Sequence, residues 1–113
     1  MSTRAVGSAA EARARWYYRL RGYRILASNA WAGGYELDLV VRRGSTLVFC
    51  EVKEKAHDRY GDPLDMVDPE KQRRIGRAAE SWLAQHPEAA DLEVRFDVVS
   101  VRGRRVECLV NAW

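Results

Sequence analysis

The sequence predicts an α/β fold in which a mixed central β-sheet is flanked by α-helices. Three observations predict it. Two segments, 8–21 and 68–85, carry apolar residues at helical spacing, residues 35–53 form an apolar hairpin, and residues 92–112 alternate in a strand-like way around a turn. A chain of 113 residues is long enough for one hydrophobic core. We therefore expect a single domain, 1–113, with the order helix, three strands, helix, two strands.

The first helix is predicted over residues 8–21. Ser8 is a plausible N-cap with Glu11 three residues later, which is a capping-box pattern, and Gly22 follows as the stop. The face expected to pack against the core consists of Ala9, Ala12, Trp16 and Leu20.

Three strands are predicted next. Residues 23–26 form a short strand, and residues 35–41 pair with residues 46–53 through a turn at 42–45. The strand at 46–53 is apolar on both faces, so we expect it to lie in the centre of the sheet.

The second half of the chain begins with a polar segment, 54–67, that is expected to form a loop. Asp68 and Pro69 then predict a helix start, and His86–Pro87 its end. Two final strands are expected at 92–101 and 105–112. The apolar face of this second helix consists of Ile75, Ala78, Ala79, Trp82 and Leu83.

Positive charge is concentrated in three clusters, within residues 1–30, 71–77 and 102–105, on either side of a net-acidic segment, 36–70. The formal net charge is only +3, but residues 1–30 contain six arginines and one acid, while the middle of the chain is net acidic. This distribution suits a protein whose basic residues bind a polyanion such as nucleic acid while its acidic residues bind a cation next to it. The alternative is that the arginines only solvate helix faces.

Cysteine and histidine do not predict a metal site. Cys50 and Cys108 lie in apolar strand-like runs, where a free thiol behaves as a small hydrophobic group. Two cysteines and two distant histidines, His57 and His86, do not make a zinc site. Because the sequence shows neither a signal-peptide pattern nor a membrane-spanning apolar run, we expect a cytoplasmic protein without a membrane partner.

The chemistry is concentrated on the central hairpin. Side chains at i and i+2 of a strand share a face, so Glu51 and Lys53 should point the same way, and the hairpin can bring Asp38 beside them. Two carboxylates can hold a hard divalent cation, and a lysine can orient water or stabilise developing negative charge. The alternative is a surface ion pair between Glu51 and Lys53, because an E-x-K triplet is common by chance.

A resemblance covers nearly the whole chain. It rests on motifs that follow one another in order: GSAAEA at 7–12, YRLRGYRIL at 18–26, ELDLV at 36–40, LVFCEVK at 47–53, GDP at 61–63, Lys71 and RFDV at 95–98. In these motifs the chain resembles the YraN-like family. That family is predicted to belong to the restriction-endonuclease-like superfamily of PD-(D/E)xK nucleases, and is similar to archaeal Holliday-junction resolvases.

The resemblance implies a restriction-endonuclease-like core and a role for each matching residue. Asp38, Glu51 and Lys53 match the catalytic acid, acid and lysine of the superfamily, and Asp38 and Glu51 would bind Mg²⁺ or Mn²⁺. Glu11 matches an acid on the first helix that approaches the metal, although it could equally complete a capping box or pair with Arg15. Lys71 matches a basic position suited to a phosphate contact.

Two departures from the family pattern stand out. The glycine that usually precedes the E-[IL]-D motif is shifted one place back, and Lys55 stands where an arginine is usual. Lysine keeps the charge but loses bidentate phosphate recognition. Arg13, Arg15, Lys55, Lys71 and Arg74 are the residues that we expect to contact nucleic acid.

These observations predict a metal-dependent nuclease acting on DNA, with junctions or branched DNA as candidate substrates and a homodimer as one assembly that would suit them. A nucleic-acid-binding protein without turnover, or an interaction protein with no nucleic-acid role, are the alternatives. Trp16 and Trp82 are expected in the core, and Asp97 is expected to satisfy a local hydrogen bond. Trp31 and Tyr60 are better candidates for stacking on bases.

Overall fold

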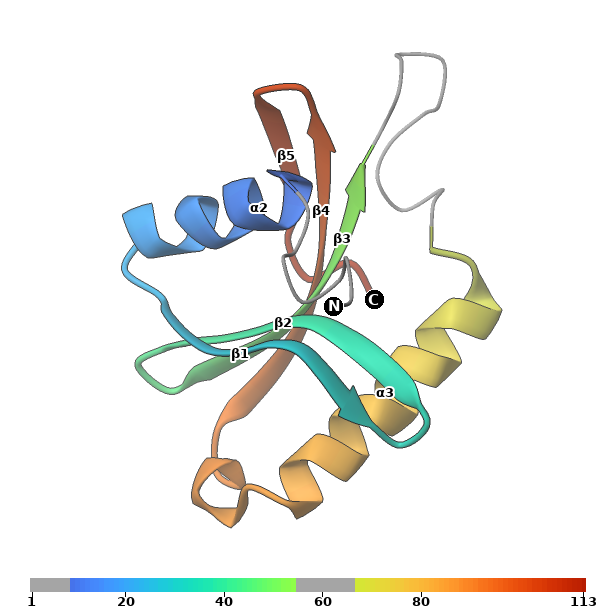
Figure 1. Ribbon diagram of the computed structural model, residues 1–113. Helices are drawn as coiled ribbons and strands as arrows, with labels where there is room; N and C mark the ends of the chain where they lie inside the picture. Colours follow the sequence, from blue (N-terminus) through green and yellow to red (C-terminus); the bar gives the residue numbers. More distant parts are fainter. Residues whose placement is uncertain (1–8, 55–66) are drawn as a thin grey trace, which may run out of the picture.

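The computed structural model describes residues 9–54 and 67–113 as a mixed sheet with a helix on each face (Figure 1). The elements are α2 (Ala9–Leu20), β1 (Arg24–Ala32), β2 (Tyr35–Arg43), β3 (Thr46–Glu54), α3 (Pro69–Ala84), the short 3₁₀ helix η2 (Pro87–Ala89), β4 (Glu93–Arg102) and β5 (Arg105–Leu109). This order confirms the predicted fold class.

The five strands lie in the sheet in the order in which they occur in the chain. Neighbouring strands are antiparallel, except that β3 and β4 are parallel. Parallel neighbours need a long crossover connection, and here that connection contains α3. The strand β3 therefore has a partner on both sides and lies in the centre of the sheet, as its apolar sequence predicts.

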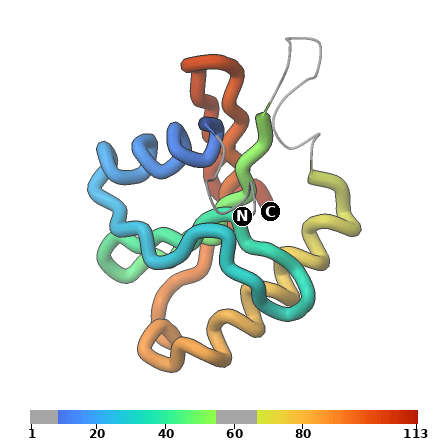
Figure 2. Tube along the Cα trace, in the orientation of Figure 1, coloured from blue at the N-terminus to red at the C-terminus, as the bar shows by residue number. Residues whose placement is uncertain are grey.

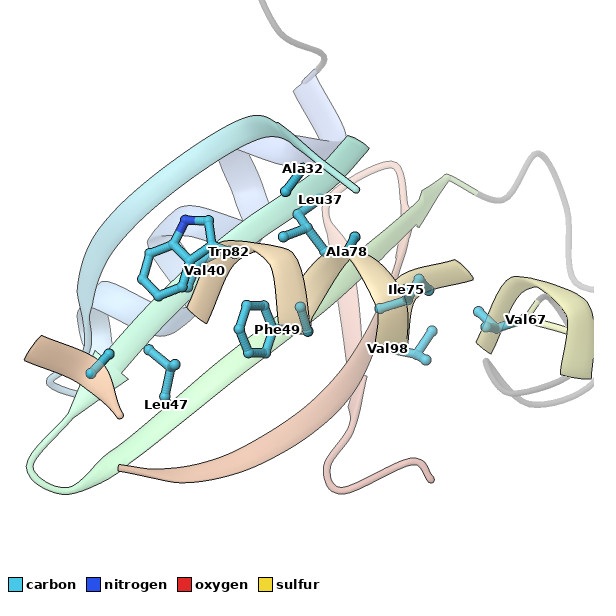
Figure 3. Packing of buried hydrophobic residues seen from close by; sticks show 12 residues of the cluster. Ala32, Leu37, Val40, Leu47, Phe49, Val67, Ile75, Ala78, Trp82 and Val98 are labelled. Carbon is cyan, nitrogen blue, oxygen red and sulfur yellow. The ribbon is translucent and has the colours of Figure 1, made fainter. Parts of the chain in front are cut away.

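Two hydrophobic clusters hold the helices on the sheet. On the α3 face, Phe49 of β3 packs edge-on against Trp82 of α3 with ring centroids 5.8 Å apart (Figure 3). On the other face, Val48 and Cys50 of the same strand pack beneath α2. The alternation of β3 side chains between two covered faces explains why this strand is apolar on both sides.

Asp68 caps the first turn of α3, as the sequence predicts. Its side chain accepts a hydrogen bond of 2.9 Å from the backbone N–H of Lys71, and Pro69 begins the helix. This cap fixes the position of Lys71 in the first turn of α3.

The turn between β1 and β2 rests directly on α3, toward which the hairpin bends in the trace (Figure 2). Gly33 has a φ of +57°, and a Cβ at this position would lie 3.1 Å from the carbonyl oxygen of Arg77. Only glycine accommodates both the backbone conformation and the close approach. The end of β2 that carries the site is thereby anchored to α3.

The first helix buries a different face from the predicted one. Trp16 and Leu20 are 59% and 76% exposed, so their expected place in the core is wrong, and the buried residues are Ala10, Ala14 and Tyr18. The two small alanines let the helix approach the sheet, and Tyr18 supplies a hydroxyl that reaches a buried carboxylate. Helical spacing alone does not distinguish these two faces.

Strand boundaries also differ from prediction. The first strand is much longer than 23–26, because β1 continues past a register shift between Ile25 and Ala27. The last strand ends at Leu109 rather than Ala112. Asn111 has a φ of +56° and turns the chain out of the strand. The proposed N-cap Ser8 and nearly all of the expected loop lie outside the described residues.

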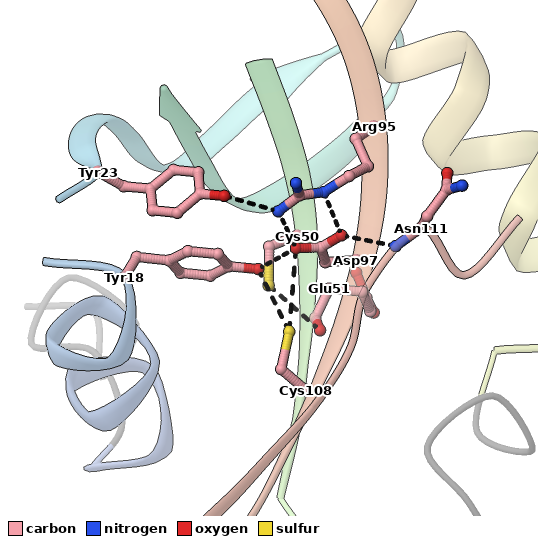
Figure 4. Close-up of polar contacts among 8 residues, drawn as sticks. All are labelled: Tyr18, Tyr23, Cys50, Glu51, Arg95, Asp97, Cys108 and Asn111. Carbon is pink, nitrogen blue, oxygen red and sulfur yellow. Dashed lines mark hydrogen bonds and ion pairs between the residues drawn. The ribbon is translucent and has the colours of Figure 1, made fainter. Parts of the chain in front are cut away.

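Asp97 of β4 is fully buried and ties distant parts of the chain together (Figure 4). Its carboxylate accepts hydrogen bonds of 2.8 Å from the Tyr18 hydroxyl and 3.0 Å from the Asn111 backbone N–H. Arg95 adds two bonds of 3.0 Å from Nε and Nη2, and that same Nη2 also reaches the hydroxyl of Tyr23. The expected local bond is present, but it belongs to a network that links β4 to α2, to the residue before β1 and to the C-terminal segment.

We expect Asp97→Asn to lower the free energy of unfolding by about 3 kcal/mol, because removal of one partner leaves the Arg95 guanidinium without its counter-charge. Urea denaturation followed by circular dichroism measures the change. The exposed Asp91→Asn, which is the same substitution, should shift the free energy by less than about 0.5 kcal/mol. Equal stability of the two variants would contradict the role of Asp97.

Candidate active site

The candidate site lies where β2 and β3 separate. Their backbone pairing runs from the turn as far as Leu39 and Cys50 and is not continued at Asp38. There the side chain replaces the backbone, since Asp38 Oδ2 accepts a hydrogen bond of 2.8 Å from the N–H of Val52. The carboxylate of Asp38 is thus inserted between the two strands, beside Glu51.

Glu51 and Lys53 share one face of β3, as the strand period predicts. Lys53 Nζ lies 3.2 Å from Glu51 Oε2, and the hydroxyl of Tyr35 lies 3.5 Å from the same oxygen. Glu51 is only 5% exposed, so this is not the surface ion pair of the alternative interpretation. A buried carboxylate that keeps one cationic and one hydroxyl partner is held in a fixed orientation.

Burial raises the pKa of Asp38 to about 7, and the neighbouring charge of Glu51 adds to the increase. The hydrogen bond from Val52 and the charge of Lys53 act in the opposite direction, while Glu11 raises the pKa further. Two neighbouring carboxylates in a partly dry site oppose each other's ionisation. A cation bound between the two carboxylates would remove this repulsion and stabilise their ionised forms.

A second lysine lies beside Lys53. Burial acts to lower the pKa of Lys53, but a hydrogen bond with Lys71 and the charge of Glu51 outweigh it and raise the pKa. The pKa of Lys71 is lowered, first by the hydrogen bond with Lys53 and then by burial. An ammonium group can only donate, so Lys71 accepts this bond as the neutral amine, while Lys53, which pairs with Glu51, keeps its proton. Helix α3 thus brings Lys71 to the site, as the sequence suggests.

Glu11 approaches the site from α2. Its carboxylate accepts a hydrogen bond of 3.2 Å from the side-chain amide of Asn29 on β1, and its charge raises the pKa of Asp38. Asn29 has a φ of +52°, which asparagine tolerates better than most residues. The position of Glu11 is therefore close enough for an electrostatic influence, while its part in metal binding stays a prediction.

The donor set fits a hard divalent cation held by two side chains. Within residues 9–54 and 67–113, no three His, Cys, Asp or Glu side chains come together as a metal-binding group. Mg²⁺ is commonly bound through one or two carboxylates and keeps several waters. Asp38 and Glu51 provide two buried carboxylates of this kind.

The remaining predicted contacts are distributed differently. Arg74 forms an ion pair of 3.2 Å with Glu70 on the surface of α3, and Arg13 lines a groove along α2. Arg15 lies one turn after Glu11 on α2. Trp31 is 74% exposed and available for stacking. Lys55, His57 and Tyr60 lie outside the described residues.

Sequence reasoning missed two partners of the site carboxylates, Tyr35 and Asn29. Tyr35 follows the Gly33–Gly34 turn and faces Glu51 because β2 bends there, and the burial of its ring and the charge of Glu51 raise its pKa. Its place directly after a diglycine turn is a usable signal. Asn29 gives no signal in the sequence, because its contact depends on how α2 packs against β1.

Comparison of the sequence with known proteins identifies the family of the chain. Residues 10–101 match the sequence profile described as "Uncharacterised protein family UPF0102". The chain belongs to the UPF0102 family. This confirms the resemblance at the level of the family, since the name YraN is carried by one of its members.

Relatives in the UPF0102 family align along most of their length. A UPF0102 protein of Klebsiella pneumoniae is 38% identical over 98% of this chain and 88% of the relative. The UPF0102 protein YraN of Escherichia coli O1:K1 is 37% identical over 100% of this chain and 87% of the relative. A Rhodopseudomonas palustris member is 46% identical over 84% of this chain and 69% of its own.

The two described helices, α2 and α3, are too short and too polar to cross a membrane.

We expect Asp38→Asn to stabilise the protein at alkaline pH in EDTA. The folded-state pKa of Asp38 lies above its unfolded value of about 3.9, so the stability that it contributes is present below about pH 4 and lost as the pH rises through about 7. The amide oxygen of asparagine can still accept the Val52 hydrogen bond.

The variant should therefore match the wild type at about pH 4 and exceed it by roughly 2 kcal/mol at about pH 8.5, as measured by urea denaturation across pH. Asp91→Asn controls for a change of one surface charge. A difference between Asp38→Asn and the wild type that does not vary with pH would contradict the raised pKa.

Proposed function

We propose that the chain is a metal-dependent nuclease that hydrolyses phosphodiester bonds of DNA. The observation that carries the proposal is the convergence of two carboxylates, Asp38 and Glu51, with Lys53 at the point where two central strands separate. The membership of the UPF0102 family and its resemblance to PD-(D/E)xK nucleases support it.

Each residue has a definite task in this proposal. Asp38 and Glu51 would hold Mg²⁺ or Mn²⁺, which supplies Lewis-acid polarisation of the phosphodiester and lowers the pKa of a bound water. Tyr35 and Lys53 hold the Glu51 carboxylate in place. Lys53 also carries a proton close to the reacting phosphate and can stabilise the negative charge that develops there.

Lys71 is suited to a phosphate contact next to the site. It is fixed in the first turn of α3 by the Asp68 cap and lies against Lys53. A phosphate that binds near both lysines would stabilise the protonated form of each. This gain favours a polyanionic substrate at this end of the sheet.

The second candidate is a nucleic-acid-binding protein without turnover. It needs only the positive charge of the arginines and exposed rings such as Trp31, which is 74% exposed, and no bound metal. Under this alternative, binding would fall steeply with salt and no metal would support cleavage.

Metal binding is tested by thermal unfolding in EDTA, Mg²⁺ and Mn²⁺. A bound cation at 100 times its dissociation constant adds about 2.7 kcal/mol to the wild type. Asp38→Asn and Glu51→Gln should abolish this gain. Glu80→Gln, on the exposed surface of α3, should retain it. Equal metal stabilisation of all four proteins would rule out the assigned ligands.

Cleavage is tested with labelled single-stranded, duplex, flap and four-way-junction DNA in the presence of Mg²⁺ or Mn²⁺. We expect Asp38→Asn and Lys53→Ala to lower the rate by at least about 100-fold, since each removes an interaction with the reacting groups. Arg104→Ala, in the exposed turn between β4 and β5, should cleave within a few-fold of the wild type. Undiminished cleavage by both site variants would overturn the proposal, and binding without cleavage by the wild type would favour the second candidate.

A further inference from the structure

A pocket of about 240 Å³ opens at the C-terminal end of α2, away from the candidate active site. It lies between the end of α2 with the segment that follows it, the end of β2, the start of β4 and the residue that follows β5. We call it the Tyr–Arg pocket. It is lined by Tyr17, Tyr18, Arg21, Tyr23, Arg43, Arg95, Asp97 and Val110.

Two of its arginines have their guanidinium groups over tyrosine rings. The guanidinium of Arg21 lies 3.7 Å from the centre of the Tyr17 ring, and that of Arg43 lies 4.4 Å from the centre of the Tyr23 ring. One nitrogen of each is also fixed, because Arg21 Nη1 donates to the carbonyl of Tyr17 and Arg43 Nη1 donates to the carbonyl of Arg21. Such a cation–π contact orders a guanidinium group and leaves its remaining N–H groups able to form further hydrogen bonds.

The third arginine, Arg95, is held in place by the buried hydrogen-bond network around Asp97 (Figure 4). Arg95 uses Nε and Nη2 to bind the Asp97 carboxylate and the Tyr23 hydroxyl, and none of these bonds uses Nη1. Full burial of a carboxylate is costly unless several donors compensate it, and here they do. Three lining arginines and one aspartate leave a formal charge of +2 in the pocket.

A groove continues from the pocket along α2. It has a volume of about 380 Å³ and shares Tyr17 and Arg21 with the Tyr–Arg pocket. Trp16, which is 59% exposed, and Arg13 line it. An exposed indole beside arginines is a surface on which a base can stack.

We propose that the Tyr–Arg pocket binds a phosphate group of a nucleotide, with Arg21 and Arg43 as the charged contacts and Trp16 beside the attached base. Pre-ordered, forked guanidinium groups with an excess of two positive charges match the oxygens of a phosphate. The naming of a nucleic-acid strand as the source of that phosphate rests on the proposed function; the phosphate contact itself does not.

The pocket is separate from the active site. Arg43 lies five residues after Asp38 on β2, which is about 17 Å at roughly 3.4 Å per residue. A phosphate in the pocket therefore cannot touch a cation held by Asp38. The pocket would act as an additional anchor for a strand or for a nucleotide end.

The first experiment measures phosphate binding by the full chain in EDTA. Inorganic phosphate, a nucleoside 5′-monophosphate and a short single-stranded DNA with or without a 5′-phosphate are titrated separately. The readouts are the NMR signals of the arginine Nε–H groups and the tryptophan fluorescence. We expect the signals of Arg21 and Arg43 to shift on addition of phosphate, and the mononucleotide also to quench fluorescence.

The variants are Arg21→Gln and Arg43→Gln, with Arg104→Gln as a control that removes the same charge from an exposed turn. Each pocket variant should weaken phosphate binding by about tenfold and reduce the salt dependence of single-strand binding by about 0.7 in the log–log slope. Arg43→Lys keeps the charge and loses the fork, so it should fall between the wild type and Arg43→Gln, and it serves if Arg43→Gln does not fold.

Binding that is equally weakened by Arg104→Gln, or arginine signals that do not move, would overturn the proposal. A dependence on the 5′-phosphate identifies a strand end as the ligand, whereas equal binding of both strands identifies an internal phosphate, and both support the pocket. If Asp38→Asn loses cleavage but Arg43→Gln binds phosphate as well as the wild type, the proposed pocket is wrong and the proposed function stands. If phosphate binding depends on Arg43 but the wild type cleaves no DNA, the proposed function is wrong and the pocket stands.

Discussion

The hydrogen bond between Asp38 Oδ2 and the N–H of Val52 is the interaction on which the candidate site depends. It forms where the pairing of β2 with β3 ends, and it places a carboxylate in the position that a backbone carbonyl would otherwise occupy. The part of β2 that is not paired with β3 holds Tyr35, which reaches Glu51, and it adjoins the Gly33 turn, which rests on α3. The candidate site and the contact between the β1–β2 turn and α3 therefore both depend on the point where the pairing of β2 with β3 is interrupted. Interruptions of strand pairing are common next to functional side chains.

The parts that could be predicted from the sequence are those set by local patterns. The order of elements followed from periodicity and turn residues, and the Asp68 cap followed from its neighbouring proline. The shared face of Glu51 and Lys53 followed from the period of a strand, and the central place of β3 from its two apolar faces. Each of these inferences needs only residues that are close in the chain.

The parts that could not be predicted depend on packing between distant segments. The burial of Tyr18 rather than Trp16 is decided by Asp97, which lies on a strand near the other end of the chain. The extension of β1 depends on its pairing with β2 rather than on its own sequence, which is short of strand-forming residues around Ser28 and Asn29. The Tyr–Arg pocket is likewise lined by residues of α2, β2 and β4 and of the segments that follow α2 and β5, so no single sequence motif predicts it.

The parallel pairing of β3 with β4 has a consequence for how the molecule comes to be folded. During synthesis β3 emerges with β2 as its only neighbour, and its second edge stays open until α3 and β4 have followed. An apolar strand with an open edge is prone to pair with other chains, and the long crossover makes its closure entropically slow. The strand that carries Glu51 and Lys53 is thus the one whose nascent form most needs protection, and the late arrival of β4 completes the sheet and shields it.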